Sequence, residues 1–205
     1  QDKIISTGGE GGYVSFKDPA AGEWAWSFKD HGKNRARATD RDAPPGFRWL
    51  HDSVGTNWRM PGPLAAIGLA QLAKLDEWVA IRRRNASIWA KALAGVGGLE
   101  LPMPRPGVSH AYYKLYAYLP ELGDAQQLRD SILERAAAAG LRLFSGSCSE
   151  VYLERAFEGL PRPRLPVAHS LGRRSLMVEV HPTLRPDALK ARGEALAEIV
   201  MDVLG

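Results

Sequence analysis

The sequence contains a single cysteine, Cys148, which excludes an internal disulfide framework and is too little for a cysteine-based zinc site. Runs of about 18 or more apolar residues are absent, and the first residues lack the basic segment and apolar stretch of a signal peptide. The sequence therefore predicts no membrane span and no metal site. We expect a soluble, cytoplasmic protein with a reduced thiol at Cys148.

The charge balance is also weak, because 27 Lys and Arg residues stand against 23 Asp and Glu residues, a formal net charge of +4. A positive excess suits nucleic acid, a membrane surface or an anionic small molecule. The basic residues are scattered, and the one tight cluster, at positions 82–84, falls in a predicted helix where a solvated face explains it. We therefore expect neither a nucleic-acid nor a membrane partner.

With 205 residues and 45% hydrophobic composition, the chain can bury one large core or two small ones. It begins at Gln1 and runs straight into a glycine-rich turn, as if it opened inside a structural element. We therefore expect a piece of a longer protein, with part of the functional site outside this sequence. The isolated piece is expected to be inactive.

The first part of the chain alternates short β-prone runs with glycines. Residues 4–6 and 12–16 favour strands around the glycines at 8–12, a pattern that predicts a hairpin-like connection. Residues 30–58 are rich in Pro, Gly, Arg and Asp and predict a long loop without regular structure. From Pro61 apolar residues recur at helical spacing and predict one long helix, straight or bent, to about residue 95, in which Gly68 indicates close packing.

The second part predicts a small α+β domain from about residue 96. Strands are expected at 110–119, 141–144 and 175–180. One helix begins at the N-cap Asp124, with Gln127 completing a capping box, and stops at Gly140. A final amphipathic helix begins at Pro186.

Lys3 stands just before the glycine-rich turn, and this placement has a chemical use. A lysine amine forms an imine with an aldehyde cofactor, and backbone N–H groups of a glycine turn favour a phosphate. The glycines are not followed by Gly-Lys-Ser/Thr, so the turn is no P-loop. The alternative for Lys3 is a solvated surface lysine, the common place for this residue type.

Four motifs follow one another over residues 2–93. They are Asp-Lys-Ile-Ile-Ser-Thr-Gly-Gly-Glu-Gly-Gly at 2–12, Asp-His-Gly at 30–32, Gly-Thr-Asn-Trp-Arg-Met at 55–60, and the helical segment that begins Ala-Ala-Ile-Gly-Leu-Ala-Gln-Leu at 65–72. Together they resemble the DegT/DnrJ/StrS-type aminotransferases, whose pattern has Lys-x-x-x-Thr-Gly-Glu-Gly-Gly, Asp-His-Gly and Gly-x-Asn-x-Arg-Met in this order. This chain has one extra glycine in the first motif, and its C-terminal half fits more loosely.

The resemblance implies an α/β fold, the fold-type I architecture of pyridoxal-phosphate (PLP) enzymes, which is that of aspartate aminotransferase. Residues 1–60 would then be the C-terminal part of the large PLP-binding domain, 61–95 a long connecting helix, and 96–205 a small C-terminal α+β domain. The resemblance also implies a homodimer with the active site at the interface.

By the same resemblance, Lys3 matches the catalytic Schiff-base lysine that carries the cofactor. Asn57 matches the residue that reaches the cofactor phosphate of the neighbouring subunit, and Arg59 would support the same loop or bind an anionic group. From the residues alone, Asn57 is a turn or cap residue before Pro61 and Arg59 forms a surface ion pair. The family's partners for the cofactor ring would lie upstream of Gln1.

The implied reaction is transfer of an amino group from a donor, expected to be glutamate, to a keto sugar linked to a nucleotide. Lys3 would carry the proton between the donor carbon and the cofactor. The implied role is amino-sugar biosynthesis for a surface polysaccharide or a glycosylated metabolite.

One departure from the family concerns substrate. Where many members carry His-Tyr-Pro, this chain has Ser-Gly-Ser-Cys-Ser-Glu-Val-Tyr at 145–152. Ser147, Ser149 and Tyr152 are candidates to hydrogen-bond the sugar or the nucleotide. The alternative is that Ser147 or Ser149 caps a helix over 150–156. For His110 and His181 a structural role is expected.

Two other functions stay open. A PLP-dependent sugar dehydratase has the same fold, but those enzymes typically carry histidine in place of the lysine, so Lys3 favours transamination. A non-catalytic regulatory relative or basic binding module would take up no cofactor.

Overall fold

The computed structural model describes residues 3–205, so Gln1 and Asp2, where the first motif begins, lie outside the described residues. The chain divides into two compact units, Gln1–Lys74 (unit 1) and Leu75–Gly205 (unit 2). This boundary falls inside the stretch 61–95 that was expected to be one connecting helix.

Unit 1 contains the helices α1 (Pro19–Lys29), α2 (Arg35–Thr39) and α3 (Gly62–Leu72). Helix α1 begins where the Asp18 carboxylate accepts from the backbone N–H of Ala20 at 3.0 Å, with proline at the first helical position. Helix α2 begins where Asn34 Oδ1 accepts from the backbone N–H of Arg37 at 3.0 Å. Side-chain caps therefore define the start of both helices.

The strands predicted at 4–6 and 12–16 are wrong, since neither segment forms a strand. A strand is stabilised by backbone hydrogen bonds to a neighbouring strand, whereas residue 6 bonds to a helix and residues 12–16 are exposed. The backbone N–H of Ser6 donates to Gln71 Oε1 on α3 at 2.7 Å, and Tyr13 is 95% exposed. The loop predicted at 30–58 is confirmed around 43–46, but it includes the short helix α2 because Asn34 caps it.

The helix predicted over 61–95, straight or bent, is interrupted in the structure, because α3 ends at Leu72 and α4 spans Leu75–Leu93. The backbone N–H of Lys74 bonds to the carbonyl of Gln71, three residues back, at 3.0 Å, which is tighter than the α-helical pattern. The close packing predicted at Gly68 is confirmed, since a Cβ there would lie 3.3 Å from Thr7 Cγ2.

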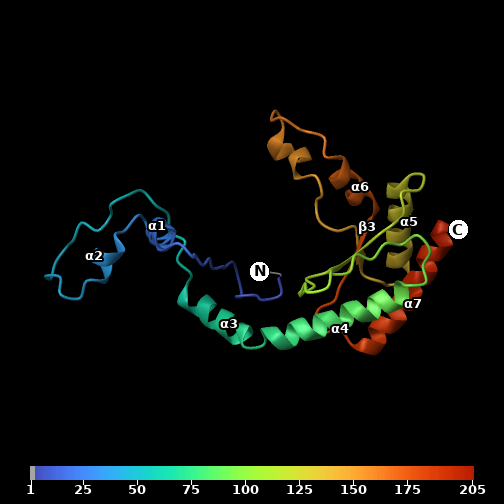
Figure 1. Cartoon of the computed structure of the whole chain (residues 1–205), viewed down its shortest axis with the longest axis horizontal. Helices are drawn as coiled ribbons and strands as arrows, with labels where there is room; N and C mark the ends of the chain where they lie inside the picture. Colours follow the sequence, from blue (N-terminus) through green and yellow to red (C-terminus); the bar gives the residue numbers. More distant parts are fainter. Residues whose placement is uncertain (1–2) are drawn as a thin grey trace. The chain divides into compact units, whose positions relative to one another are not determined.

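Unit 2 is built around a three-stranded antiparallel sheet in the order β1-β3-β2 (Figure 1). The strands are β1 (Leu115–Tyr118), β2 (Leu143–Phe144) and β3 (Ser175–Val178), shorter than the predicted strands but inside them. Leu115 of β1 and Leu143 of β2 both face Val178 of β3. The predicted order of strand, helix, strand, strand and helix is found here, except that a helix over Pro166–Arg174, which was not predicted, lies between the second and third strands.

The core of unit 2 lies between the sheet and the helices α4, α5 (Ala125–Ala138) and α7 (Pro186–Leu204). Alternate residues of β1 are buried, and the rings of Tyr116 and Tyr118 stack on its other face with centroids 6.3 Å apart. The most completely buried apolar side chains are Leu93, Leu119, Ile132, Val180, Leu189 and Val200. Among residues 3–205, no helix has the length and apolar character to cross a membrane.

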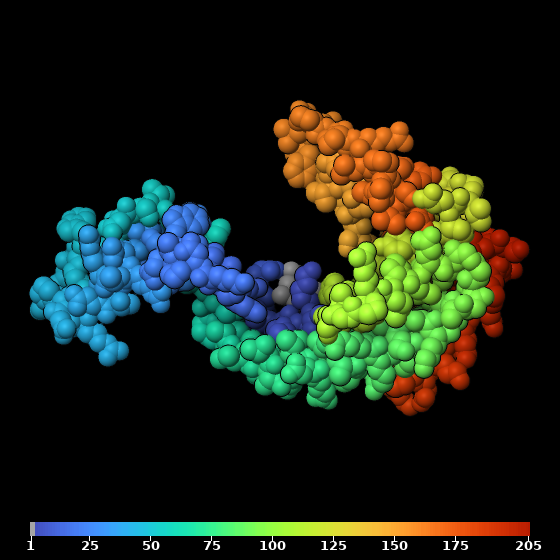
Figure 2. Space-filling model, in the orientation of Figure 1, coloured from blue at the N-terminus to red at the C-terminus, as the bar shows by residue number. Residues whose placement is uncertain are grey.

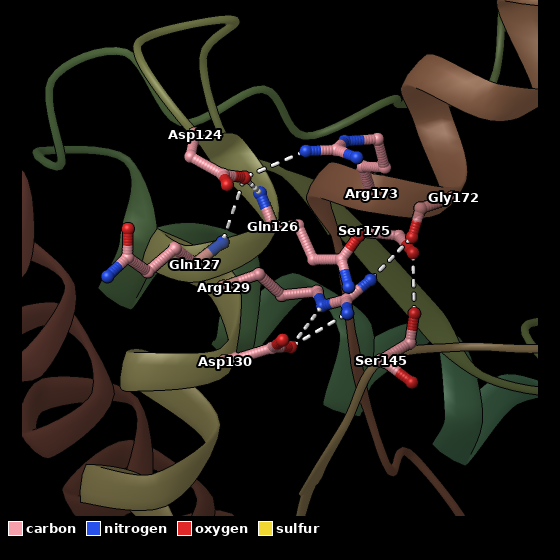
Figure 3. A network of polar contacts seen from close by, with 9 residues as sticks. All are labelled: Asp124, Gln126, Gln127, Arg129, Asp130, Ser145, Gly172, Arg173 and Ser175. Carbon is pink, nitrogen blue, oxygen red and sulfur yellow. Dashed lines mark hydrogen bonds and ion pairs between the residues drawn. The ribbon is translucent and has the colours of Figure 1, made fainter.

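The predicted cap of α5 is confirmed and also joins α5 to α6 (Pro166–Arg174), as Figure 3 shows. Asp124 Oδ1 accepts from the backbone N–H groups of Gln126 and Gln127 at 3.1 and 3.3 Å and from Arg173 Nη2 at 2.8 Å. Arg129 Nη1 donates to the carbonyl of Gly172 at 2.7 Å. Two arginine contacts therefore hold the C-terminal end of α6 against α5.

The helix predicted over 150–156 is wrong, because two short 3-10 turns, η1 (Val151–Leu153) and η2 (Arg155–Phe157), replace it. Glu154 between them has an extended ψ of 147°, and neither turn has a side-chain cap, so Ser147 and Ser149 do not cap a helix here. Figure 2 shows the segment from η1 to α6, in orange, standing out from the rest of unit 2; we call residues 150–170 the lobe.

Candidate active site

Lys3 is exposed and opens the glycine-rich segment of unit 1. Gly8 has a φ of +78°, and a Cβ on it would lie 3.2 Å from Ile67 Cδ1 of α3. A Cβ on Gly11 would lie 2.5 Å from Met60 Cε and 2.9 Å from Thr7 Oγ1. The glycines therefore let this segment approach α3 and residue 60 more closely than larger residues would permit.

The second and third motifs lie side by side. The backbone N–H of His31 donates to the carbonyl of Thr56 at 3.0 Å, and that of Trp58 donates to the carbonyl of Lys29 at 2.9 Å. Asp30 and Asn57 form an isolated antiparallel bridge. The Asp-His-Gly turn is thus the backbone support on which Asn57 is held.

Glycine is required where these two motifs meet. Gly32 has a φ of +82°, and a Cβ on it would lie 1.8 Å from the carbonyl oxygen of Ser53. A Cβ on Gly55 would lie 2.4 Å from the backbone nitrogen of Gly32. No side chain fits at either position, so the two turns pack together only with glycine at 32 and 55.

The Asp30 carboxylate is nearly buried and faces two cations. Lys33 Nζ lies 3.0 Å from Asp30 Oδ1, and Arg59 Nε lies 3.7 Å from the same oxygen. The hydrogen bond from Lys33 is the main cause that holds the pKa of Asp30 below its ordinary value. Asp30 is therefore charged at neutral pH.

Arg59 also bonds to Asn57, since its Nε donates to Asn57 Oδ1 at 3.0 Å. With its oxygen accepting from Arg59, the Asn57 amide has its two N–H donors for another acceptor. Donors of this kind, with the cations of Lys33 and Arg59 nearby, suit an anionic group such as a phosphate. The structure therefore brings Asn57 and Arg59 together, and their donors fit the phosphate of a cofactor. Separately, the amine of Lys3 fits the aldehyde of such a cofactor.

Ser147 lies in unit 2, on the loop that follows β2. Its Oγ is 3.3 Å from the hydroxyl of Tyr116. Ser175 Oγ donates to the carbonyl of Ser145 at 2.5 Å, as Figure 3 shows. Gly146 has a φ of +102°, and a Cβ there would lie 2.8 Å from Tyr116 Cε1. The loop is therefore fixed across the tyrosine face of β1, with Ser147 exposed.

Tyr152 lies in the lobe, where its hydroxyl is hydrogen-bonded in both directions. It donates to Glu150 Oε1 at 2.6 Å and accepts from the backbone N–H of Leu165 at 3.3 Å. His169 Nδ1 of α6 lies 2.9 Å from Glu150 Oε2. The bond from Tyr152 and then that of His169 lower the pKa of Glu150, and the bond to Glu150 raises the pKa of Tyr152. Glu150 therefore links η1 to α6.

The two histidines singled out in the sequence have partners within unit 2. His110 Nδ1 accepts from the backbone N–H of Tyr112 at 3.0 Å, next to the positive φ of 49° at Tyr112. His181 Nδ1 lies 2.8 Å from Thr183 Oγ1, and burial lowers the pKa of His181. Within the part of the chain that the structure describes, no three His, Cys, Asp or Glu side chains gather in a way that could hold a metal ion.

Sequence reasoning gave no role to Asp30, Tyr116, Glu150 or His169. Asp30 belongs to the Asp-His-Gly motif, and its position three residues before Lys33 indicates the ion pair between them. The contact of Glu150 with His169 spans 19 positions of the sequence and has no local signal.

Comparison with known proteins gives one consistent result. The profile of the DegT/DnrJ/EryC1/StrS aminotransferase family matches residues 1–196. A solved aminotransferase from Psychrobacter cryohalolentis is 41% identical, with a TM-score of 0.87, over 100% of this chain and 55% of its own.

Two curated relatives are sugar aminotransferases by name. The dTDP-3-amino-3,4,6-trideoxy-alpha-D-glucose transaminase of Streptomyces venezuelae is 28% identical over 92% of this chain and 45% of its own length. The dTDP-4-dehydro-2,3,6-trideoxy-D-glucose 4-aminotransferase of Saccharopolyspora spinosa is 30% identical over 89% of this chain and 46% of its own length.

The chain spans about half the length of the curated relatives that it matches. The family match nevertheless covers unit 1, most of unit 2 and all four sequence motifs. The chain therefore belongs to the DegT/DnrJ/EryC1/StrS aminotransferase family, whose members are fold-type I, PLP-dependent enzymes.

Proposed function

We propose that this chain is the C-terminal part of an enzyme that transfers an amino group to a keto sugar linked to a nucleotide, with PLP as its cofactor. The observation that carries the proposal is Lys3 before a glycine segment packed closely on α3, within the family match. The names of the two curated relatives support a sugar substrate.

PLP, when bound, supplies an aldehyde for amine chemistry and an electron-withdrawing ring that stabilises negative charge on the donor carbon. Lys3 would hold it through Nζ, and the released Nζ would carry the proton between the donor carbon and the cofactor. Asn57 Nδ2 would donate to the phosphate of the cofactor that the neighbouring subunit holds. Arg59 would support Asn57, because its Nε donates to Asn57 Oδ1 at 3.0 Å.

Substrate contacts would come from the loop after β2. Ser147 is more accessible than Tyr152, because it is exposed and its Oγ lies 3.3 Å from the Tyr116 hydroxyl. Tyr152 stays a candidate, although its hydroxyl already has a donor and an acceptor in the lobe. We propose that both bind sugar or nucleotide through hydroxyl hydrogen bonds.

The remaining parts of the proposal rest on the family resemblance. They are glutamate as amino donor, a homodimer in which Asn57 serves the neighbouring subunit's cofactor, and a cytoplasmic role in making amino sugars for a polysaccharide or a glycosylated metabolite. No contact among the described residues tests any of these three parts, and each stays a prediction.

The test is borohydride reduction of the complete protein with PLP, followed by peptide mass mapping around Lys3. A reduced pyridoxyl adduct on Lys3, absent in Lys3→Ala, is expected. A folded protein that gains no adduct with PLP in excess would contradict the proposal and favour a non-catalytic relative. With the adduct in hand, release of an amino sugar separates transamination from dehydration of the same substrate class.

A further inference from the structure

We propose that Asp30 is a positioning residue that sets the orientation of the Asn57 amide through Arg59, and so controls affinity for the cofactor phosphate without touching it. This inference rests on the proposed function, because it assigns a role toward the cofactor phosphate. It concerns only unit 1, where all the residues lie.

The first step is that the backbone holds Asp30 and Asn57 as a pair. They form an antiparallel bridge, and the flanking bonds from His31 to Thr56 and from Trp58 to Lys29 are 3.0 and 2.9 Å long. The Asp30 side chain is 12% exposed. A charged carboxylate with so little solvent access requires cationic partners, and here they are Lys33 and Arg59.

The second step is that Arg59 Nε lies between two oxygens. It is 3.0 Å from Asn57 Oδ1 and 3.7 Å from Asp30 Oδ1, so the carboxylate attracts the guanidinium to the place where it bonds the amide. The Arg59 side chain is 50% exposed, so holding it in one rotamer costs conformational entropy. Its attraction to the Asp30 carboxylate offsets this cost. Asp30 thus restrains Arg59, and Arg59 restrains the amide oxygen.

The third step is the consequence for an anion. When Oδ1 is fixed by Arg59, the N–H groups of Asn57 have one orientation and need no reordering when a phosphate binds. Without the charge of Asp30, Arg59 is released and the amide rotates or reverses. The cost then falls on phosphate binding and leaves the aldehyde end of the cofactor unaffected.

The experiment compares PLP with pyridoxal, which lacks the phosphate, by absorbance titration of the complete apo-protein. Asp30→Asn removes the charge with little change of shape, and Arg59→Gln removes the link. Asp52→Asn is the matched control, because that carboxylate pairs with Arg37 at 3.1 Å and is 47% exposed. The double variant Asp30→Asn/Arg59→Gln tests whether Asp30 acts on Asn57 through Arg59, because the two effects should then not add.

The expected result is a PLP affinity weaker by about 3- to 10-fold in Asp30→Asn and in Arg59→Gln, the effect of one hydrogen bond. The double variant should lose no more than either single variant, and pyridoxal affinity and the Asp52→Asn control should be unchanged. An unchanged PLP affinity in Asp30→Asn, or equal weakening of PLP and pyridoxal, would overturn the inference.

Arg59→Gln keeps the test decisive if Asp30→Asn does not fold, because Arg59 is half exposed and unchanged PLP affinity in that variant also overturns the inference. Failure of the proposed function looks different: the unmodified protein then forms no adduct on Lys3 and binds neither PLP nor pyridoxal.

Discussion

The carbonyl oxygen of Ser53 occupies the space that a side chain on Gly32 would need, since a Cβ there would lie 1.8 Å from it. Gly32 also has a φ of +82°, and its carbonyl accepts from the backbone N–H of Asp52 at 3.0 Å. The Asp-His-Gly motif therefore depends on glycine for both conformation and space.

Gly32→Ala is expected to destabilise unit 1 by about 2 kcal/mol or more, because positive-φ strain adds to a clash with backbone that cannot move away. The matched control is Gly107→Ala in unit 2, where φ is +83° and nothing lies within 4 Å of a Cβ. That variant should show only the strain, about 1 kcal/mol. Denaturant unfolding measures both losses, amide exchange over residues 28–57 locates that of Gly32→Ala, and equal losses would contradict the assigned clash.

Asn85→Ala should destabilise unit 2 by about 2 kcal/mol, because it leaves buried carbonyls without a donor. Asn85 is 0% exposed on α4, and its Nδ2 donates to the carbonyls of Val180 and His181 at 3.3 and 3.1 Å. Ser87→Ala, at an exposed position of the same helix, is the control. Thermal unfolding checks the order, and a loss no greater than that of Ser87→Ala would show that the amide adds no stability.

The contribution of Asp124 to the stability of unit 2 should fall as the pH is lowered into the acid range. The backbone N–H of Gln127 is the main cause that lowers the pKa of Asp124, with Arg173 contributing. The stabilising effect is therefore present above the ordinary value of 3.8 and is lost as the pH falls below it. Asp124→Ala should lower the melting temperature at pH 7 but not near pH 2, and Asp124→Asn should fall between it and the parent. A difference that persists at pH 2 would contradict this.

Tyr152→Phe should raise the pKa of Glu150 toward its ordinary value of 4.5, because the hydrogen bond from Tyr152 is the largest cause of its lowering. His169→Gln should raise it less, as the second cause. Side-chain carboxyl resonances followed by NMR through acid pH measure the change. Tyr116→Phe, which leaves Glu150 alone, is the control, and a Glu150 pKa that does not move in Tyr152→Phe would show that Tyr152 does not hold the carboxylate.

The sequence predicted those helices whose first and last residues are marked by a cap, a proline or a glycine. Helix α5 begins at its Asp124 cap and ends before Gly140, whose φ is +72°, and α7 begins at Pro186, as the sequence predicted. Asp18 and Pro19 carry an equally local start signal, yet no helix was predicted at the position of α1.

Tertiary contacts explain what the sequence did not predict. The apolar pattern runs through residues 73 and 74 without glycine or proline, so the break between α3 and α4 had no local sign. Of the candidate site, the pairing of Asn57 with Arg59 has a short spacing, but its support by Asp30 depends on a bridge across 27 positions. The link from Glu150 to His169 likewise exists only after the lobe has folded.

The order β1-β3-β2 has a consequence for how the protein is made. The central strand β3 is the last of the three along the chain, and β1 and β2 each pair with it. On a ribosome, the outer strands leave the exit tunnel first and have no described partner strand until Ser175–Val178 follows them. Unit 2 therefore acquires its sheet only once β3 has been made, and a nascent chain stopped before residue 175 should expose β1 and β2 to chaperones without their shared partner strand.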